Sequence, residues 1–464
     1  MKLVDRAFVG GLFVLAGGCG DDRPAPGPTD LLGKLQAIPG VTATQVPTDT
    51  AGFDYYVLQF TQPIDHDAPG GQTFQQEVSL LHHADDAPMV VQTSGYFDYY
   101  LDRPVELTGL LNGNQISIEH RFFGTSRPDP ADWTKLTIEQ MAADEHEIIV
   151  ALRDIYPGAF ITTGGSKGGM TATYHRRFYP EDVDGTVPYV APMSFAAPDA
   201  RYTGFVDSIG TDGCRAALRA AATEMLQNRR AAMESRAAAQ SGHTYTRIAL
   251  GPAVEGSIAS LEWAFWQYYG VEFCPQVPAA TASDDALFDF LDEISPVGDN
   301  DDDQVAQFEA YYYQAYAQLG YPDGNATYLD PFLLYTDRDY DGALPTPTLP
   351  TYDGATAMHD VETYVQSEGS RLLFIYGQWD PWTGGQYELG QATDSLKLIQ
   401  VQGTHGSRIN RLAPADRDAA YAKLAAWTGV SPTAPAAQAL QRLAEPREPR
   451  EPRVPPVMIR HGSH

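Results

Sequence analysis

The sequence predicts an α/β fold in which a mostly parallel sheet is interrupted by a helical insertion. Short β-branched segments alternate with helical segments near both ends of the chain, and a glycine-rich turn joins a strand directly to a helix within residues 160–178. The alternation stops between residues 197 and 350. Strands and helices in alternation favour a parallel sheet covered on both faces. A chain of 464 residues has room for a large core and a second unit.

Residues 1–19 have the pattern of an export signal. A basic start precedes an apolar run that is too short to remain as a bilayer-spanning helix. Cys19 follows Ala16-Gly17-Gly18, which resembles a bacterial lipoprotein signal with a lipidated cysteine, although leucine is usual where Ala16 stands. Simple secretion is the alternative. Residues 20–35, rich in Pro, Gly and Asp at their start, are predicted to be a linker.

The first part of the core is predicted over residues 36–196. Two strands separated by a turn rich in Pro, Asp and Gly indicate an antiparallel start to the sheet. Buried strands and one helix follow, and then the strand, turn and helix that contain Ser166. The predicted strands are 55–60, 74–81, 88–93, 115–121, 160–162 and 185–190, and the predicted helix is 138–152.

Residues 197–350 are predicted to form a helical cap, with long helical stretches at 214–240 and 305–319. The cap contains Cys214 and Cys274, the two cysteines outside the signal. In an exported chain two cysteines indicate one disulfide, which across a loop of this length contributes roughly 2–4 kcal/mol. Two buried free thiols are the alternative.

Residues 351–430 return to the alternating pattern and are predicted to complete the core. Residues 431–464 are rich in Ala and Pro and repeat Glu-Pro-Arg, which predicts a disordered tail. The elements expected in the second part of the core are a helix at 355–366, strands at 371–376 and 396–401, and a helix at 414–427.

Gly164, Ser166 and Gly168 match the pattern G-x-S-x-G, between a predicted strand and a predicted helix. This is the pattern of a nucleophile elbow, a sharp turn that lifts a serine hydroxyl above the sheet and requires glycine where strand and helix approach closely. A glycine-rich turn that happens to contain a serine is the alternative. The amide of Lys167 is the first predicted oxyanion donor, and the amide of Tyr96, in the loop after the predicted strand 88–93, is the second.

A serine nucleophile needs a base, and the base needs an orienting carboxylate. Asp380 and His405 each follow a predicted strand, and with Ser166 they appear in the chain order Ser, Asp, His that accompanies this elbow. The alternatives are a turn aspartate before Pro381 and a loop histidine. The sequence therefore predicts an α/β-hydrolase sheet with a Ser166–Asp380–His405 triad that needs no cofactor and no metal.

Longer motifs resemble a known enzyme family. Residues 164–174 read GGSKGGMTATY and residues 119–126 read EHRFFGTS. These runs resemble the secreted prolyl tri/tetrapeptidyl aminopeptidases of actinobacteria and, more distantly, the lysosomal prolyl carboxypeptidase and dipeptidyl peptidase II family. The resemblance spans roughly residues 53–427. It implies a serine exopeptidase with a helical cap that cleaves after proline and releases short peptides from free N-termini, with Ser166 as nucleophile, Asp380 as orienting acid and His405 as base.

The block from Glu119 to Arg121 is interpreted as structural. His120 precedes the elbow, which is the wrong chain order for the base. Glu119 and Arg121 are predicted to form an ion pair near the top of the sheet.

Substrate recognition is predicted in the cap segment 260–274. A carboxylate there can pair with the substrate's ammonium group, and aromatic faces can pack on a proline ring. The alternative is that the carboxylates are solvated and the aromatic residues are cap core. The candidate residues are Glu262, Trp263, Trp266 and Glu272, together with Trp379 beside Asp380.

The chain carries 31 Lys and Arg against 60 Asp and Glu, a net charge of −29, which disfavours nucleic acid and anionic lipid surfaces as partners. We expect a monomer that acts on peptides and touches membrane only through an N-terminal lipid. An esterase or lipase of the same fold is the nearest rival, but the cap lacks long lipid-facing apolar runs. A surface-anchored, non-catalytic binding module is a second rival, which the complete Ser, Asp, His set disfavours.

Overall fold

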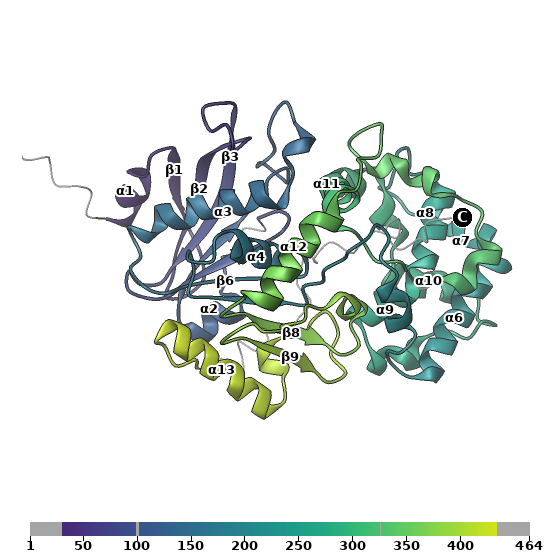
Figure 1. Ribbon diagram of the computed structural model, residues 1–464. Coiled ribbons are helices and arrows are strands. Elements are labelled where there is room, and N and C mark those ends of the chain that lie inside the picture. Colours follow the sequence, from purple (N-terminus) through teal and green to yellow (C-terminus); the bar gives the residue numbers. More distant parts are fainter. Residues whose placement is uncertain (1–29, 99–101, 325, 434–464) are drawn as a thin grey trace, which may run out of the picture.

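A computed structural model describes residues 30–98, 102–324 and 326–433, and within them nine strands form one sheet in the order β1-β2-β3-β5-β4-β6-β7-β8-β9 (Figure 1). The first part of the sheet is antiparallel and the part from β5 to β9 is parallel. The predicted fold class and its antiparallel start are therefore confirmed. The strands are β1 (Val41–Val46), β2 (Asp54–Pro63), β3 (Thr73–His82), β4 (Met89–Thr93), β5 (Asn114–Ile118), β6 (Phe160–Gly165), β7 (Gly185–Tyr189), β8 (Leu373–Gly377) and β9 (Leu396–Gln400).

The edge strand β1 was not predicted. It pairs antiparallel with β2, with Val41 opposite Phe60 and Ala43 opposite Leu58. Val41 and Ala43 are buried while the threonines between and after them are exposed. The segment VTATQV is rich in β-branched residues and begins with alternating buried and exposed positions, so the sequence did carry a strand signal here.

Helices cover both faces of the sheet, as the alternation along β8 shows. Leu373 and Ile375 pack in one cluster with α2 (Glu106–Leu111) and α13 (Pro414–Thr428). Leu372, Phe374 and Tyr376 belong to another cluster, with side chains of α4 (Lys167–Phe178) and α12 (Gly354–Ser367). Successive side chains of a strand point to opposite faces, so one strand contributes to both layers. The helix α3 (Ile138–Arg153) also contributes to this second cluster, through Ile138, Met141 and Ala142.

The helix α1 (Leu31–Gln36) lies inside the segment 20–35 that was predicted to be a linker. Asp30 caps it, because its Oδ1 accepts the Gly33 N–H at 2.7 Å, and Leu35 is fully buried against the strands β1 to β5. The folded core therefore begins before residue 36. The predictions for the signal, for Cys19 and for nearly all of the tail lie outside the described residues.

The described part of residues 197–350, called the cap from here on, is helical and contributes no strand to the sheet, and Figure 1 shows its helices gathered to one side of the core. The predicted disulfide is present between Cys214 and Cys274, with a Cα–Cα distance of 5.6 Å. The cap helices are α5 (Arg201–Val206), α6 (Asp212–Gln227), α7 (Arg230–Ala239), α8 (Leu250–Ala259), α9 (Leu261–Tyr268), α10 (Asp284–Ile294) and α11 (Asp302–Gln314), with short 3₁₀ or π turns at η2 (Val271–Gln276), η3 (Val297–Asn300), η4 (Ala315–Leu319), η5 (Thr327–Phe332) and η6 (Asp337–Ala343).

The helix predicted over 214–240 is broken into α6 and α7. Glu224, in the last turn of α6, accepts hydrogen bonds from Asn228 Nδ2 at 2.6 Å and from Arg229 Nε at 2.8 Å. The side chains of Asn228 and Arg229 therefore bind Glu224 just past the last residue of α6, where the helix ends. Among the described residues, no helix combines the length and the apolar character needed to cross a bilayer.

Candidate active site

Ser166 occupies the turn between β6 and α4 and has φ 54° and ψ −125°. Few residues other than glycine adopt this region, and holding one there costs about 1–3 kcal/mol. The Ser166 N–H donates to Tyr189 O at 2.9 Å, and Ser166 O accepts the Met170 N–H at 3.0 Å, which starts α4. The predicted elbow therefore has its expected strained geometry, with a half-buried serine at the edge of the sheet.

The glycines of the elbow are required by close packing. A Cβ on Gly164 would lie 2.4 Å from Gly168 C, and a Cβ on Gly168 would lie 2.3 Å from Thr93 O. Gly169 is similarly close to the Ala191 side chain, at 2.8 Å. These distances are shorter than any normal contact of a methyl group, so no larger residue fits without moving the backbone.

The loop after β4 is pressed against this elbow. Gly95 has φ 73°, and a Cβ there would lie 2.6 Å from Gly168 N. Thr93 Oγ1 lies 2.6 Å from Gly168 O. The predicted second oxyanion donor, the Tyr96 N–H, donates to Ser94 Oγ at 3.1 Å in this structure. The loop is thus in place beside the elbow, and its Tyr96 amide already has a weak local acceptor.

Asp380 and His405 are brought together although 25 residues separate them. His405 Nδ1 lies 2.7 Å from Asp380 Oδ2, and both side chains are buried. Asp380 follows β8 and His405 follows β9, and these strands run parallel to β6 in the same sheet. The carboxyl ends of parallel strands meet at one edge, so the pair and Ser166 share that edge.

The cap reaches this edge directly. The His405 N–H donates to Gln267 O, at the end of α9, at 2.9 Å. The ring of Tyr268 lies edge-on to the His405 ring, with centroids 6.4 Å apart. The cap therefore helps to hold the loop that carries His405.

Comparison with known proteins identifies the family. A model of the family described as PS-10 peptidase S37 matches residues 25–446. The chain belongs to this family of serine peptidases. It is 38% identical over 412 residues to the prolyl tri/tetrapeptidyl aminopeptidase of Streptomyces mobaraensis, covering 87% of this chain and 86% of that one.

More limited similarities extend over parts of the chain or over the fold. The lysosomal Pro-X carboxypeptidase of Mus musculus is 31% identical over 184 residues, which is 34% of this chain and 37% of that one. A proline iminopeptidase structure from Mycobacterium smegmatis has 15% identity and a TM-score of 0.34, covering 78% of this chain and 91% of that one. A peroxisomal α/β-hydrolase from Saccharomyces cerevisiae has 12% identity and a TM-score of 0.37, covering 81% and 91%.

An aromatic cluster in this peptidase lies beside His405. The ring of Trp382 is 6.4 Å from the His405 ring and 5.3 Å from that of Trp263, and Tyr202 contacts both tryptophans. The indole N–H groups of Trp263 and Trp382 are buried without a hydrogen-bond partner among the described residues. Trp263 was predicted from the sequence, whereas Trp382 and Tyr202 were not. Trp382 stands two residues after Asp380, and this position was the one sign in the sequence that it lies near the predicted acid.

The other predicted substrate residues have different surroundings. Trp266 is fully buried and its ring is 6.0 Å from the half-buried Trp379. Glu262 is buried, and Arg219 Nε lies 2.8 Å and 3.1 Å from its two oxygens. Burial raises the pKa of Glu262, while Arg219 opposes that rise. Glu272 is exposed. Glu262 is thus already paired with Arg219, and Glu272 faces solvent.

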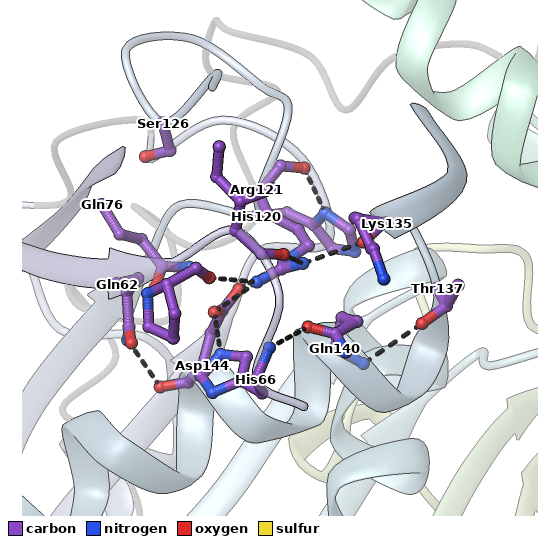
Figure 2. Close-up of polar contacts among 12 residues, drawn as sticks. Gln62, His66, Gln76, His120, Arg121, Ser126, Lys135, Thr137, Gln140 and Asp144 are labelled. Atoms are coloured by element: carbon purple, nitrogen blue, oxygen red, sulfur yellow. Dashed lines mark hydrogen bonds and ion pairs between the residues drawn. The ribbon is translucent and has the colours of Figure 1, made fainter. Parts of the chain in front are cut away.

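The predicted ion pair between Glu119 and Arg121 is wrong. The fully buried Arg121 pairs instead with Asp144, with Nε 2.7 Å from Oδ2 and Nη2 2.8 Å from Oδ1 (Figure 2). The chain leaves β5 at Ile118, so the two-residue alternation that would place the side chains of residues 119 and 121 together no longer applies. Glu119 turns to the next loop, where its Oε1 accepts the Ser126 N–H at 2.9 Å.

Proposed function

We propose that this serine peptidase removes tri- or tetrapeptides from free N-termini by cleaving after proline, through an acyl-enzyme on Ser166. The hydrogen-bonded Asp380–His405 pair at the sheet edge that carries a strained Ser166 is the observation that supports this chemistry. Similarity to the Streptomyces aminopeptidase over 87% of the chain supports the substrate class.

In the proposed mechanism, Asp380 holds His405 through Nδ1–H, so that Nε2 takes the proton as Ser166 Oγ attacks the scissile carbonyl. The amides of Lys167 and Tyr96 donate to the developing oxyanion. Collapse of the tetrahedral intermediate breaks the C–N bond, and His405 gives its proton to the leaving amine. Water then attacks the acyl-enzyme by the same route, and the short peptide leaves with a proline carboxylate.

The cluster of Tyr202, Trp263 and Trp382 is the proposed proline pocket. Aromatic faces pack well on a compact, apolar pyrrolidine ring. Trp382 is in ring contact with His405, so a ring seated against it lies next to the bond being cleaved. Glu262 remains the candidate for binding the substrate's ammonium group. In that role its carboxylate would contact both this group and Arg219.

We also propose that the enzyme is exported and anchored by a lipid on Cys19. The basic start, the apolar run and the small residues before Cys19 support this assignment. Labelling cells with a palmitate analogue should mark the wild-type protein and leave Cys19→Ala unmarked. Labelling of both proteins, or of neither, contradicts the anchor.

A panel of peptides with a fluorogenic leaving group tests the activity. Free tri- and tetrapeptides that end in proline should be cleaved at least tenfold faster than their N-acetylated or alanine-terminated counterparts. Equal rates on free and acetylated peptides would make the enzyme an endopeptidase. Turnover of p-nitrophenyl esters without any peptide cleavage would favour an esterase.

A further inference from the structure

Lys167 is a buried lysine one residue after the proposed nucleophile. It is 3% exposed, and among the described residues no carboxylate forms an ion pair with its Nζ, although Glu145 is close enough to oppose the fall in its pKa that burial causes. Removing an ammonium group from water costs several kcal/mol unless other groups compensate. The compensation here comes from one short hydrogen bond to Gly95 O, at 2.6 Å, and from the faces of Tyr96 and Phe123, at 5.3 Å and 5.2 Å from Nζ.

The acceptor of that hydrogen bond has a particular place in the site. Gly95 C=O and Tyr96 N–H belong to one planar peptide unit, so a donor that fixes the oxygen also fixes the direction of the N–H. Gly95 itself has backbone contact with the elbow at Gly168. The Lys167 side chain therefore reaches from the elbow and ties down the same peptide that carries the proposed second oxyanion donor.

We propose that Lys167 is a positioning residue for the oxyanion hole, contributing one donor through its own amide and orienting the other through its side chain. This inference rests on the proposed function. Ser94 supports the same arrangement, since its hydroxyl lies 2.9 Å from both Tyr96 O and Ile118 O. The Tyr96 N–H donates to Ser94 Oγ at 3.1 Å, and in the proposed mechanism it is shared with the oxyanion.

Two buried titratable groups, Glu145 and His120, interact electrostatically with Lys167. Burial, and then the nearby Asp144, raise the pKa of Glu145, on α3, well above its ordinary value and favour its neutral form, while Lys167 opposes the rise. Burial and the nearby Lys167 lower the pKa of His120, which is then also neutral. His120 uses Nδ1 for a hydrogen bond to Arg121 O at 2.8 Å. The Lys167 nitrogen can donate to Gly95 O in either protonation state, so the proposed role does not depend on its charge.

Lys167→Met in the full-length enzyme tests the proposal, because methionine fills similar space and has no donor. Loss of one oriented oxyanion donor should lower kcat by about 10²–10³ with KM nearly unchanged. A proline-terminated peptide aldehyde, which forms a tetrahedral oxyanion on Ser166, should bind more weakly by a similar factor. Product peptide, which forms no oxyanion, should bind as it does to the wild type.

Arg176→Met is the matched control. Arg176 is a fully buried cation on the same helix, and it donates to the main-chain oxygens of Pro180, Val183 and Ser370, away from the site. This variant should melt at a lower temperature and keep the wild-type ratio of aldehyde affinity to product affinity. The same ratio in Lys167→Met, with only a lower melting temperature, would overturn the proposal.

Lys167→Gln covers the case in which Lys167→Met does not fold, because glutamine keeps a polar end at this buried position but is shorter and does not reach Gly95 O as lysine does. It should show the same selective loss of kcat and of aldehyde affinity, and wild-type values for both would overturn the proposal. Failure of the wild type to bind the aldehyde or to react with a fluorophosphonate would instead reject the proposed function.

Discussion

On the sheet side of the active site, main-chain atoms pack directly against main-chain atoms, whereas the cap side is held by contacts between side chains. Gly95, Gly164 and Gly168 leave no space for even a methyl group around the elbow. In the cap, Arg219 pairs with Glu262 and Arg230 with Glu255, each at 2.8 Å, and a disulfide joins α6 to η2.

The difference has consequences for function and stability. Contacts between main-chain atoms cannot be removed one at a time. A substitution on the sheet side should therefore displace all the groups of the proposed active site together. Side-chain pairs are separable, so a change in the cap should cost stability by a limited amount for each pair. One contact between the two sides is the hydrogen bond from the His405 N–H to Gln267 O, through which damage in the cap would reach the loop that carries the proposed base.

The largest effect is expected on the sheet side, for Ser166→Ala. Triad residues act as a unit, so kcat should fall by roughly 10⁴–10⁶. The melting temperature should stay the same or rise slightly. Peptide turnover and fluorophosphonate labelling measure the loss, and mass spectrometry of the purified variant excludes carry-over of wild-type enzyme. Peptidase activity within tenfold of the wild type would remove Ser166 from the mechanism.

The next largest effect is expected from removing the cap disulfide in a Cys214→Ala, Cys274→Ala double variant. A bridge across a loop of this length contributes roughly 2–4 kcal/mol to stability. The cap should therefore unfold at a lower denaturant concentration than in the oxidised wild type. Because η2 follows the segment that holds His405, kcat should fall more than KM rises. Unchanged stability and kcat would show that the cap does not need this covalent link.

A pH-dependent effect on stability is expected from Asp98, which lies in the segment after β4 on the sheet side. Burial, and then the nearby Glu77 and Glu119, raise its pKa to about 7, although hydroxyls of Ser79 and Ser117 oppose the rise. An acid whose folded pKa is raised gives stability that is complete below its unfolded pKa, about 4, and is lost as the pH rises to about 7.

Asp98→Asn removes that titration. The melting temperature of the variant minus that of the wild type should grow between about pH 4 and pH 7, by a few degrees, and level off above that range. Scanning calorimetry across this range measures it. A difference that stays constant with pH would mean that Asp98 does not titrate there.

The smallest effect is expected in the cap, from Glu262→Gln. If Glu262 binds the substrate amine, KM should rise several-fold for free peptides and hardly change for N-acetylated ones. If Glu262 only pairs with Arg219, the variant should lose about 1–3 kcal/mol of stability and leave both KM values unchanged. Measuring KM for the two peptide classes decides between these results, and Glu272→Gln, at an exposed position, is the matched control.

The amino-acid sequence by itself determined the features that depend on neighbouring residues. The elbow needs small residues and a strained serine between a strand and a helix, and this is a local pattern that Gly164, Ser166 and Gly168 carry together. Asp380 and His405 were chosen as the predicted acid and base because each follows a recognisable strand. Cys214 and Cys274 were paired because no other cysteine follows the predicted signal.

Tertiary structure alone decided which distant side chains meet. Arg121 binds Asp144 on α3 instead of its near neighbour Glu119, and Glu262 is paired with Arg219 across two cap helices. The cluster of Tyr202, Trp263 and Trp382 joins residues from the cap and from the second part of the core. A local pattern specifies the backbone conformation of a segment, but partners far apart in the chain are selected by packing and by the cost of burying a charge without a counterion.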